Sequence, residues 1–209
     1  HDVRLLEKRQ LGRGASWAAA GMIAPVMEAE YGEDELLELS LRSQELYPDF
    51  VANLEDETGR DVDFRTEGTL GLAFDQPQTA ELDRKAEFLR SQGFDVASLT
   101  SEEVRSLEPR ISSYVVEGIH VPSERQVDNR KLVEALAERC RMRGVDLHEQ
   151  EPVTDLEYSG NRIETIVSSE GTYRPDAVLI CAGVGSSGIE GLKETDRMPV
   201  RPVKGEALS

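Results

Sequence analysis

The chain has 209 residues, of which 38% are hydrophobic, so it is long and apolar enough for one or two domains with a packed core. Its formal net charge of -17 at pH 7 argues against nucleic-acid binding, because phosphate backbones require a basic surface. No apolar run approaches the roughly 20 residues that cross a bilayer, and charged residues interrupt the apolar stretch near the N-terminus. We therefore expect a cytoplasmic protein with no membrane span.

The acidic residues are spread along the whole chain, and lysine is scarce beside arginine. One hypothesis is that the protein works in concentrated salt, where dense carboxylates keep a surface hydrated. The alternative is an ordinary acidic cytoplasmic protein. The two cysteines, Cys140 and Cys181, lie in helical or apolar patterns and outside any metal-ligand spacing. We expect both to be buried as small hydrophobic residues, with no bound metal.

The first seven residues read as a strand already in progress, in which Val3, Leu5 and Leu6 lead to the acid Glu7. An apolar strand that ends in an acid is typical of the second strand of a dinucleotide-binding unit, where the carboxylate accepts hydrogen bonds from ribose hydroxyls. The glycine-rich turn of such a unit lies about 20 residues earlier. It is therefore either cut off from this chain or was never present.

Small residues dominate the segment from Gly12 to Pro25, which follows this strand. They allow a close approach of the backbone to a planar or phosphorylated ligand, with the Ser16 hydroxyl available to a phosphate. The main-chain amides of Ala20, Gly21 and Met22 could reach a cofactor ring. A seam of small residues for helix packing is an equally good interpretation of the same pattern.

The middle of the chain, residues 31–125, predicts an α+β insertion. Leucines at helical spacing predict a long helix over 35–57, closed by Gly59. Two short strands are expected within 64–74, a helix over 79–92 ended by Gly93, and a strand over 118–122. Thr100 and Glu103 form the sequence pattern of a capping box, which predicts a short helix that ends near Pro109.

The C-terminal part again alternates helices and strands. Asp128 is expected to cap a helix that ends at Gly144, followed by a strand over 145–148 and a hairpin over 153–167. The continuous apolar run 176–183 predicts a strand covered on both faces, with Gly183 at the sheet edge where α/β folds bind nucleotides. A strand-to-loop glycine without chemical meaning is the alternative. We predict an α/β domain from residues 1–30 and 126–209.

No catalytic side chain stands out. His120 is expected to pack within its strand, His148 to be exposed among acids, and Lys204 to be a solvated charge beside a turn glycine. The sequence contains no Ser/His/Asp or Cys/His order and no phosphate-binding Walker loop. These observations give no basis for a hydrolase, a kinase or a metalloenzyme.

Taken together, several segments resemble the FAD-dependent D-amino-acid-oxidase superfamily, and most closely the glycine oxidases of thiamine biosynthesis. The resemblance covers essentially the whole chain, with residues 18–22 and the closing stretch 202–209 as its most specific parts. The carrying segments are Leu5-Leu6-Glu7-Lys8, residues 16–22, Ser43-Gln44-Glu45-Leu46-Tyr47, Glu102-Glu103-Val104 with Glu108-Pro109, Val127-Asp128, residues 178–185 and residues 202–209.

This resemblance implies a truncated Rossmann-like FAD-binding α/β domain with an inserted α+β substrate domain, and a role in binding FAD for ten residues. Ala15 stands where the family often has a hydroxyl residue, which puts one phosphate contact in doubt. The implied contacts are Glu7 with the ribose, Lys8 near the adenine, Ala15 and Ser16 at the pyrophosphate, the main chain of Ala20, Gly21 and Met22 at the isoalloxazine, Val153 at the adenine through its backbone, and Ala182 and Gly183 close to the cofactor.

The implied reaction is the oxidative deamination of glycine or another small amine, with hydride transfer to the flavin and reoxidation by oxygen. The resemblance places the substrate-holding arginine and tyrosine after Ser209, so no catalytic residue is expected in this stretch, and the 209 residues alone are expected to bind no FAD tightly. Alternatives are a D-amino-acid dehydrogenase, a sarcosine-type oxidase, or a non-catalytic α/β nucleotide-binding module. A homo-oligomer is left open.

Overall fold

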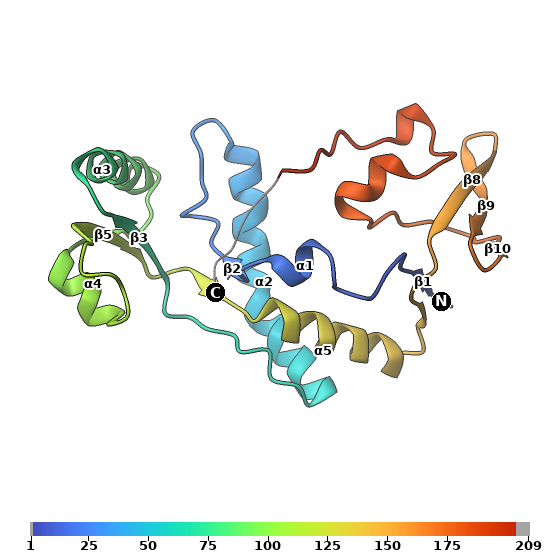
Figure 1. The fold of residues 1–209 in the computed structure, drawn as a ribbon, viewed down its shortest axis with the longest axis horizontal. Helices are drawn as coiled ribbons and strands as arrows, with labels where there is room; N and C mark the ends of the chain where they lie inside the picture. The colour runs from blue at the N-terminus through green and yellow to red at the C-terminus, as the bar shows by residue number, and fades with distance from the viewer. Residues whose placement is uncertain (1, 204–209) are drawn as a thin grey trace. The chain divides into compact units, whose positions relative to one another are not determined.

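The computed structural model describes residues 2–203, which form two compact units. Unit 1 comprises residues 1–18 and 136–209, and unit 2 comprises residues 19–135, so that the second boundary falls inside helix α5 (Asn129–Met142). The sequence placed the two boundaries at 30/31 and 125/126, and that division into domains stays a prediction. The element order is shown in Figure 1. Within residues 2–203, no helix combines the length and the apolar character that a membrane crossing requires.

Unit 1 contains two separate sheets. Strand β1 (Arg4–Leu6) pairs in parallel with β7 (Asp146–His148), as the alternation of strands and helices predicted. The hairpin of β8 (Val153–Ser159) and β9 (Arg162–Ser168) is also confirmed, and the short strand β10 (Thr172–Tyr173) adds an unpredicted third member. A register shift between Val153 and Asp155 leaves Thr154 as an irregularity at the start of β8.

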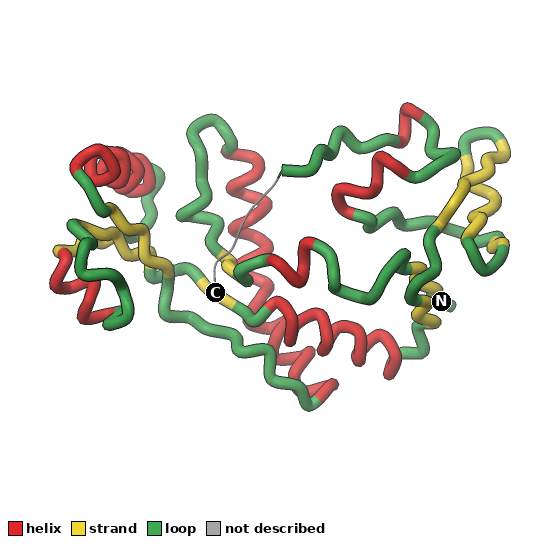
Figure 2. The backbone as a smooth tube through the Cα atoms, viewed as in Figure 1, coloured by secondary structure: helices red, strands yellow, loops and turns green. Residues whose placement is uncertain are grey.

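The predicted strand over 176–183 is wrong. Residues 176–182 lie in a loop, and Gly183 begins the first of two short 3-10 helices, η1 (Gly183–Gly188) and η2 (Glu194–Asp196), as Figure 2 shows in green and red. Leu179 is 87% exposed, and Cys181 is exposed rather than buried. The physical reason is that a strand needs a neighbour for its backbone hydrogen bonds, and no strand among residues 2–203 pairs with this run.

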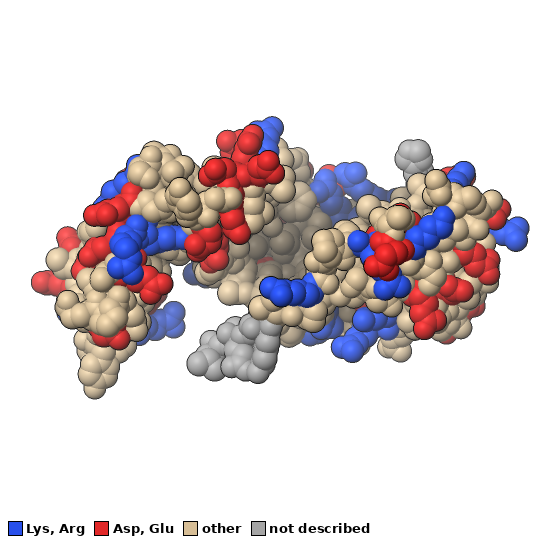
Figure 3. Space-filling model, turned by 90° about the horizontal axis from the view of Figure 1, so that it is seen from above, with Lys and Arg blue, Asp and Glu red and all other residues tan. Residues whose placement is uncertain are grey.

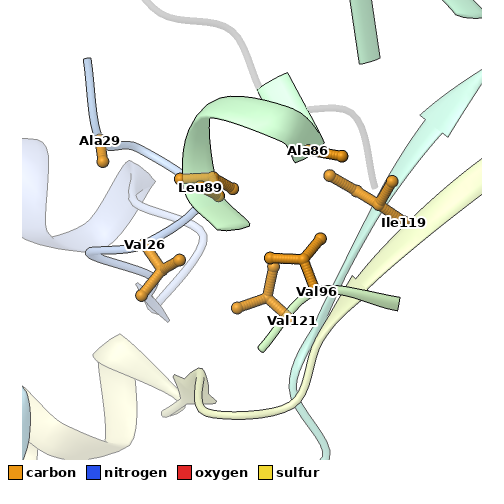
Figure 4. Packing of buried hydrophobic residues seen from close by; sticks show 7 residues of the cluster. All are labelled: Val26, Ala29, Ala86, Leu89, Val96, Ile119 and Val121. Carbon is orange, nitrogen blue, oxygen red and sulfur yellow. The ribbon is translucent and has the colours of Figure 1, made fainter. Parts of the chain in front are cut away.

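In unit 2 the hydrophobic core packs against an antiparallel sheet. Strand β5 (Glu117–Val121) lies between β3 (Thr69–Ala73) and β4 (Ala97–Thr100), and helices α3 (Gln76–Ser91) and α4 (Ser101–Leu107) both contact this sheet. Figure 4 shows the apolar side chains that gather between α3, the sheet and the segment around Val26. The buried cluster consists of Val26, Ala29, Ala86, Leu89, Val96, Ile119 and Val121.

Two short strands were expected within residues 64–74. The second of them is confirmed as β3, but the prediction of the first is wrong. Arg65 makes only an isolated antiparallel bridge with Gln126, so that residues 64–66 form no strand of their own. Gln126 instead belongs to β6 (Arg125–Gln126), which pairs with β2 (Met22–Ile23). Two-residue strands carry no periodicity in the sequence, which explains why this pair was missed.

The long helix α2 (Asp34–Thr58) confirms the predicted element, and Gly59 closes it in the left-handed conformation at φ 67°. The leucine pattern overestimates what the helix buries, because only Val51 and Leu54 are fully buried while Leu36, Leu39 and Leu46 are exposed. The helix also continues through Pro48, which cannot donate the backbone hydrogen bond of a helix interior.

The predicted helix caps are confirmed in atomic detail. Thr100 Oγ1 accepts from the Glu103 amide, and the Glu103 carboxylate accepts from the Thr100 amide at 2.8 Å, so both halves of the capping box at α4 are present. Asp128 Oδ1 accepts from the amides of Arg130 and Lys131 at the start of α5. Local chemistry therefore decides where these helices begin.

Candidate functional site

In unit 1 the loops that follow β1 and β7 are tied together at the carboxyl ends of the two parallel strands. The Glu7 amide donates to the His148 carbonyl at 2.8 Å, and the Glu151 amide donates to the Glu7 carbonyl at 2.9 Å. Further along, the Gln150 amide donates to the Arg9 carbonyl at 2.8 Å. This is the edge at which parallel α/β sheets bind ligands.

Glu7 and Lys8 lie at this edge, as predicted from the acid-ended strand. Glu7 is half-buried and its Oε1 accepts from the Arg9 amide at 2.9 Å, and a carboxylate has further acceptor sites for two ribose hydroxyls. Lys8 is exposed, and its Nζ lies 3.8 Å from the position that a Cβ on Gly185 would take. The structure therefore brings Lys8 together with the turn that follows Cys181.

Ala182 and Gly183 form that turn. Ala182 precedes η1, and its carbonyl accepts from the Gly185 amide at 2.9 Å. Gly183 adopts φ 54°, in the left-handed region that glycine occupies without strain. Both residues are exposed. Their backbone is accessible to a ligand beside Lys8, although the strand that was expected to deliver them is absent from the described residues.

Ala15 and Ser16 open the four-residue helix α1 (Ala15–Ala18), and both side chains are exposed. The Arg13 guanidinium lies over the ring of Trp17 with 3.5 Å between its Cζ and the ring centroid. This cation–π contact holds a positive charge next to the predicted pyrophosphate segment. Sequence reasoning assigned no role to Arg13, which precedes α1 by two residues.

Val153 is the first residue of β8, where it pairs with Ser168 of β9. It follows Pro152, whose carbonyl accepts from the Ser169 amide at 3.1 Å. Val153 therefore lies two residues beyond Glu151, which is bound to Glu7 through its amide. The predicted adenine contact of Val153 stays a prediction.

Ala20, Gly21 and Met22 belong to unit 2, where Gly21 has a structural reason of its own. Its carbonyl accepts from the Val127 amide at 2.9 Å, and a Cβ on Gly21 would lie 1.9 Å from the Val127 carbonyl oxygen. The small residue therefore permits the close approach of β2 to β6. The side chain of Met22 is 54% exposed, and Ala20 is exposed as well.

A polar network in unit 1 was missed from the sequence. His148 Nε2 lies 2.9 Å from Asp146 Oδ2, and His148 Nδ1 lies 2.7 Å from Glu151 Oε2. Arg4 Nη2 pairs with Asp146 at 2.7 Å, and the Arg4 guanidinium lies over the Tyr173 ring. The prediction of an exposed His148 is wrong: it pairs with Leu6 of β1, contacts two carboxylates, and its side chain is only 31% exposed.

The protonation of this network follows from its contacts. The Asp146 carboxylate, helped by Glu151, raises the pKa of His148 above its usual 6.5. Hydrogen bonds from Ser168 and Tyr173 lower the pKa of Glu151, and those from His148 and Arg4 lower the pKa of Asp146. The two carboxylates in contact with His148 therefore favour its protonated form.

We expect the stability of the protein to depend on His148. Because the folded pKa of His148 is raised, its contribution is complete below pH 6.5 and is lost as the pH rises through the raised value. The pKa values of Asp146 and Glu151 are lowered, so the contributions of these two carboxylates to stability are lost when the pH falls into the acidic range. In the parent protein, the urea concentration at the midpoint of unfolding should therefore decrease as the pH rises through the raised pKa of His148. In His148→Gln this alkaline decrease should be smaller.

His120→Gln is the matched control for this measurement, since His120 is a half-buried histidine whose Nε2 faces the Glu67 carbonyl at 2.8 Å. This variant should keep the alkaline decline. Identical pH profiles for the parent and His148→Gln would contradict the assignment.

Charge elsewhere on the described surface is mixed. On the face that Figure 3 shows, Asp and Glu side chains recur with Lys and Arg among them.

Among residues 2–203, no three His, Cys, Asp or Glu side chains gather into a set that could hold a metal ion. Cys140 is half-buried, and both cysteines are free thiols.

Comparison with known proteins gives a consistent result. Residues 1–209 match the model of a family described as DAO, FAD dependent oxidoreductase. The chain is 32% identical to a glycine oxidase of Geobacillus kaustophilus, with 100% of this chain and 55% of that protein covered. It is 26% identical to a D-amino acid dehydrogenase of Neisseria meningitidis, with 85% and 42% covered.

Among solved structures, the glycine oxidase from Bacillus cereus superposes with a TM-score of 0.82 at 27% identity, covering 90% of this chain and 50% of that one. This chain thus spans about half the length of the relatives that it matches. The match supports the predicted combination of a truncated Rossmann-like domain with an α+β insertion, even though the apolar run 176–183 forms no strand here.

Proposed function

This chain belongs to the family of FAD-dependent oxidoreductases, and from that premise we propose that the protein oxidises a small amino acid or amine, with glycine as the first candidate. The meeting of Lys8 with the 182–185 turn, beside the carboxyl ends of β1 and β7, carries the proposal. When bound, FAD would accept the hydride that leaves the α-carbon of the substrate.

The residues at this edge fit the adenosine half of that cofactor. The Glu7 carboxylate provides acceptors for the ribose hydroxyls, and the ammonium of Lys8 lies at the exposed side of the same loop. The open backbone at Ala182 and Gly183 permits the close approach of a flat or phosphorylated group. Ala15 and Ser16 are proposed to bind the pyrophosphate, and Val153 is proposed to bind the adenine.

For the isoalloxazine we propose the main chain of Ala20, Gly21 and Met22. Exposed Ala20 and Met22 flank Gly21, whose conformation is fixed by its contact with Val127. A backbone held in this way can present amides in a constant position. No side chain in the chain is assigned as an acid or a base, since hydride transfer from a neutral amine requires none.

The alternative is a dehydrogenase, and the similarity to a D-amino acid dehydrogenase supports it. The two differ in the electron acceptor, because an oxidase returns its electrons to oxygen and a dehydrogenase passes them to a carrier. Reoxidation by oxygen, the precise substrate, and a role in thiamine biosynthesis are parts of the proposal. So are a cytoplasmic location, a homo-oligomer and an adaptation to high salt.

The visible absorption spectrum of the purified full-length protein tests the function. We expect flavin bands that bleach when glycine is added without oxygen and return when air is admitted. Bands that bleach with a D-amino acid but not with glycine, and return only with an added electron carrier, would favour the dehydrogenase. A protein without flavin bands, which also fails to bind added FAD, would contradict the proposal.

A further inference from the structure

The carboxylate of Glu151 joins the two sheets of unit 1. Its side chain is only 2% exposed. On one side, Glu151 Oε1 accepts from the Ser168 hydroxyl of β9 at 2.5 Å and from the Tyr173 hydroxyl of β10. On the other side, Oε2 lies 2.7 Å from His148 Nδ1 of β7. The two sheets share no backbone ladder, so this carboxylate is a major link between them.

The backbone of Glu151 extends the link to the proposed nucleotide site. Its amide donates to the Glu7 carbonyl at 2.9 Å, directly behind the carboxylate that would hold the ribose. Two residues later, Val153 begins β8 and would hold the adenine. The position of Glu7 therefore depends on the β1–β7 sheet, and the position of Val153 depends on the β8–β9–β10 sheet. Glu151 contacts both sheets.

We propose that Glu151 is a positioning residue for the adenosine half of FAD, which sets the spacing between Glu7 and Val153. This inference rests on the proposed function, because it requires that the protein bind FAD. Glu151 itself would not touch the cofactor. It acts by fastening the loop 148–153 to Ser168 and Tyr173, so that the two nucleotide contacts are held in place before the ligand arrives.

Protonated His148 completes this arrangement. The titratable groups around it are Asp146 on its own strand and Glu151 in the following loop, with Arg4 on β1 bound to Asp146 and Tyr173 on β10 bound to Glu151. Loss of the His148 proton leaves the buried Glu151 carboxylate without its cationic partner, which loosens the loop. The affinity for FAD should therefore decline as the pH rises past the raised pKa of His148.

The test compares Glu151→Gln with the parent in the full-length protein, after removal and re-addition of FAD. We expect the Kd for FAD to rise about tenfold, the size typical of a lost hydrogen bond to a charged group, while the Kd for FMN, which has no adenosine, stays unchanged. The pH dependence of FAD binding should also flatten. Glu157→Gln makes the same chemical change at an exposed position of β8 and should leave both properties as they are.

Tyr173→Phe is the second variant, because it removes one donor to Glu151 and keeps the carboxylate, should Glu151→Gln fail to fold. It should raise the Kd for FAD by a smaller factor than Glu151→Gln does. Unaltered FAD affinity in both variants would overturn the positioning role, and so would a parallel loss of FMN affinity. A parent protein that binds neither flavin would instead overturn the proposed function.

Discussion

Replacing Gly21 by alanine should destabilise unit 2 by about 3 kcal/mol or more, because two costs add at this position. Gly21 adopts φ 78°, a conformation that L residues rarely take. The added Cβ would also lie 1.9 Å from the Val127 carbonyl oxygen, and the backbone of Asn129 follows at 3.5 Å. Since the obstacle is backbone rather than a flexible side chain, β2 and β6 must separate. Thermal and urea unfolding followed by circular dichroism would measure the loss.

Two glycine variants separate these costs. Gly93→Ala has a similar φ of 90° with nothing within 4 Å of the new Cβ, so it should lose only about 1 kcal/mol. Gly14→Ala lies in the same small-residue segment with neither constraint and should change stability by about 0.5 kcal/mol or less. A Gly21→Ala variant no less stable than Gly93→Ala would refute the steric argument. FAD affinity should fall together with stability if the main chain at Gly21 contacts the flavin.

The second large effect is expected at Glu124, a fully buried acid in unit 2. Its Oε1 accepts from the amides of Val26 and Met27, each at 2.8 Å, and so holds the segment that follows β2. Glu124→Ala should cost about 2–5 kcal/mol, because two backbone donors then lose their acceptor in a buried environment. The midpoint of urea unfolding would report this loss.

Glu124→Gln should be much milder, at about 1 kcal/mol, because the amide oxygen can still accept from both donors. Burial raises the pKa of Glu124, so the folded state disfavours its charge, and a neutral replacement removes that burden. Glu87→Ala on the exposed side of α3 is the control, and it should change little. Equal destabilisation by Glu124→Ala and Glu87→Ala would show that the two amides need no acceptor.

Local chemistry in the sequence was sufficient for much of the fold. The capping box at Thr100, the cap at Asp128 and the closing glycine at Gly59 each act within one helical turn, so their positions could be predicted from neighbouring residues alone. The hairpin around Gly160 was predicted for the same reason. The acid at the end of β1 correctly indicated the sheet edge to which Glu7 belongs.

Burial was less predictable than secondary structure. The leucines of α2 marked a helix correctly, yet Leu36, Leu39 and Leu46 remain exposed, because periodicity gives the face of a residue but not whether anything packs against that face. His148 gave the opposite error. Its neighbours in sequence are acids, but Arg4 and Tyr173, which contact the carboxylates on either side of it, come from strands far away along the chain.

The sequence by itself thus determined helices α2, α3, α4 and α5, the caps of α4 and α5, the hairpin and the resemblance to a flavoprotein family, since these depend on short-range patterns or on the order of segments. The tertiary structure alone decided that residues 176–183 form no strand, that Gly21 faces the Val127 carbonyl and that Glu151 links two sheets. Each of these outcomes depends on which distant backbone or side chain is available as a partner. Hydrogen bonds between residues far apart in the chain leave no periodic trace in the sequence.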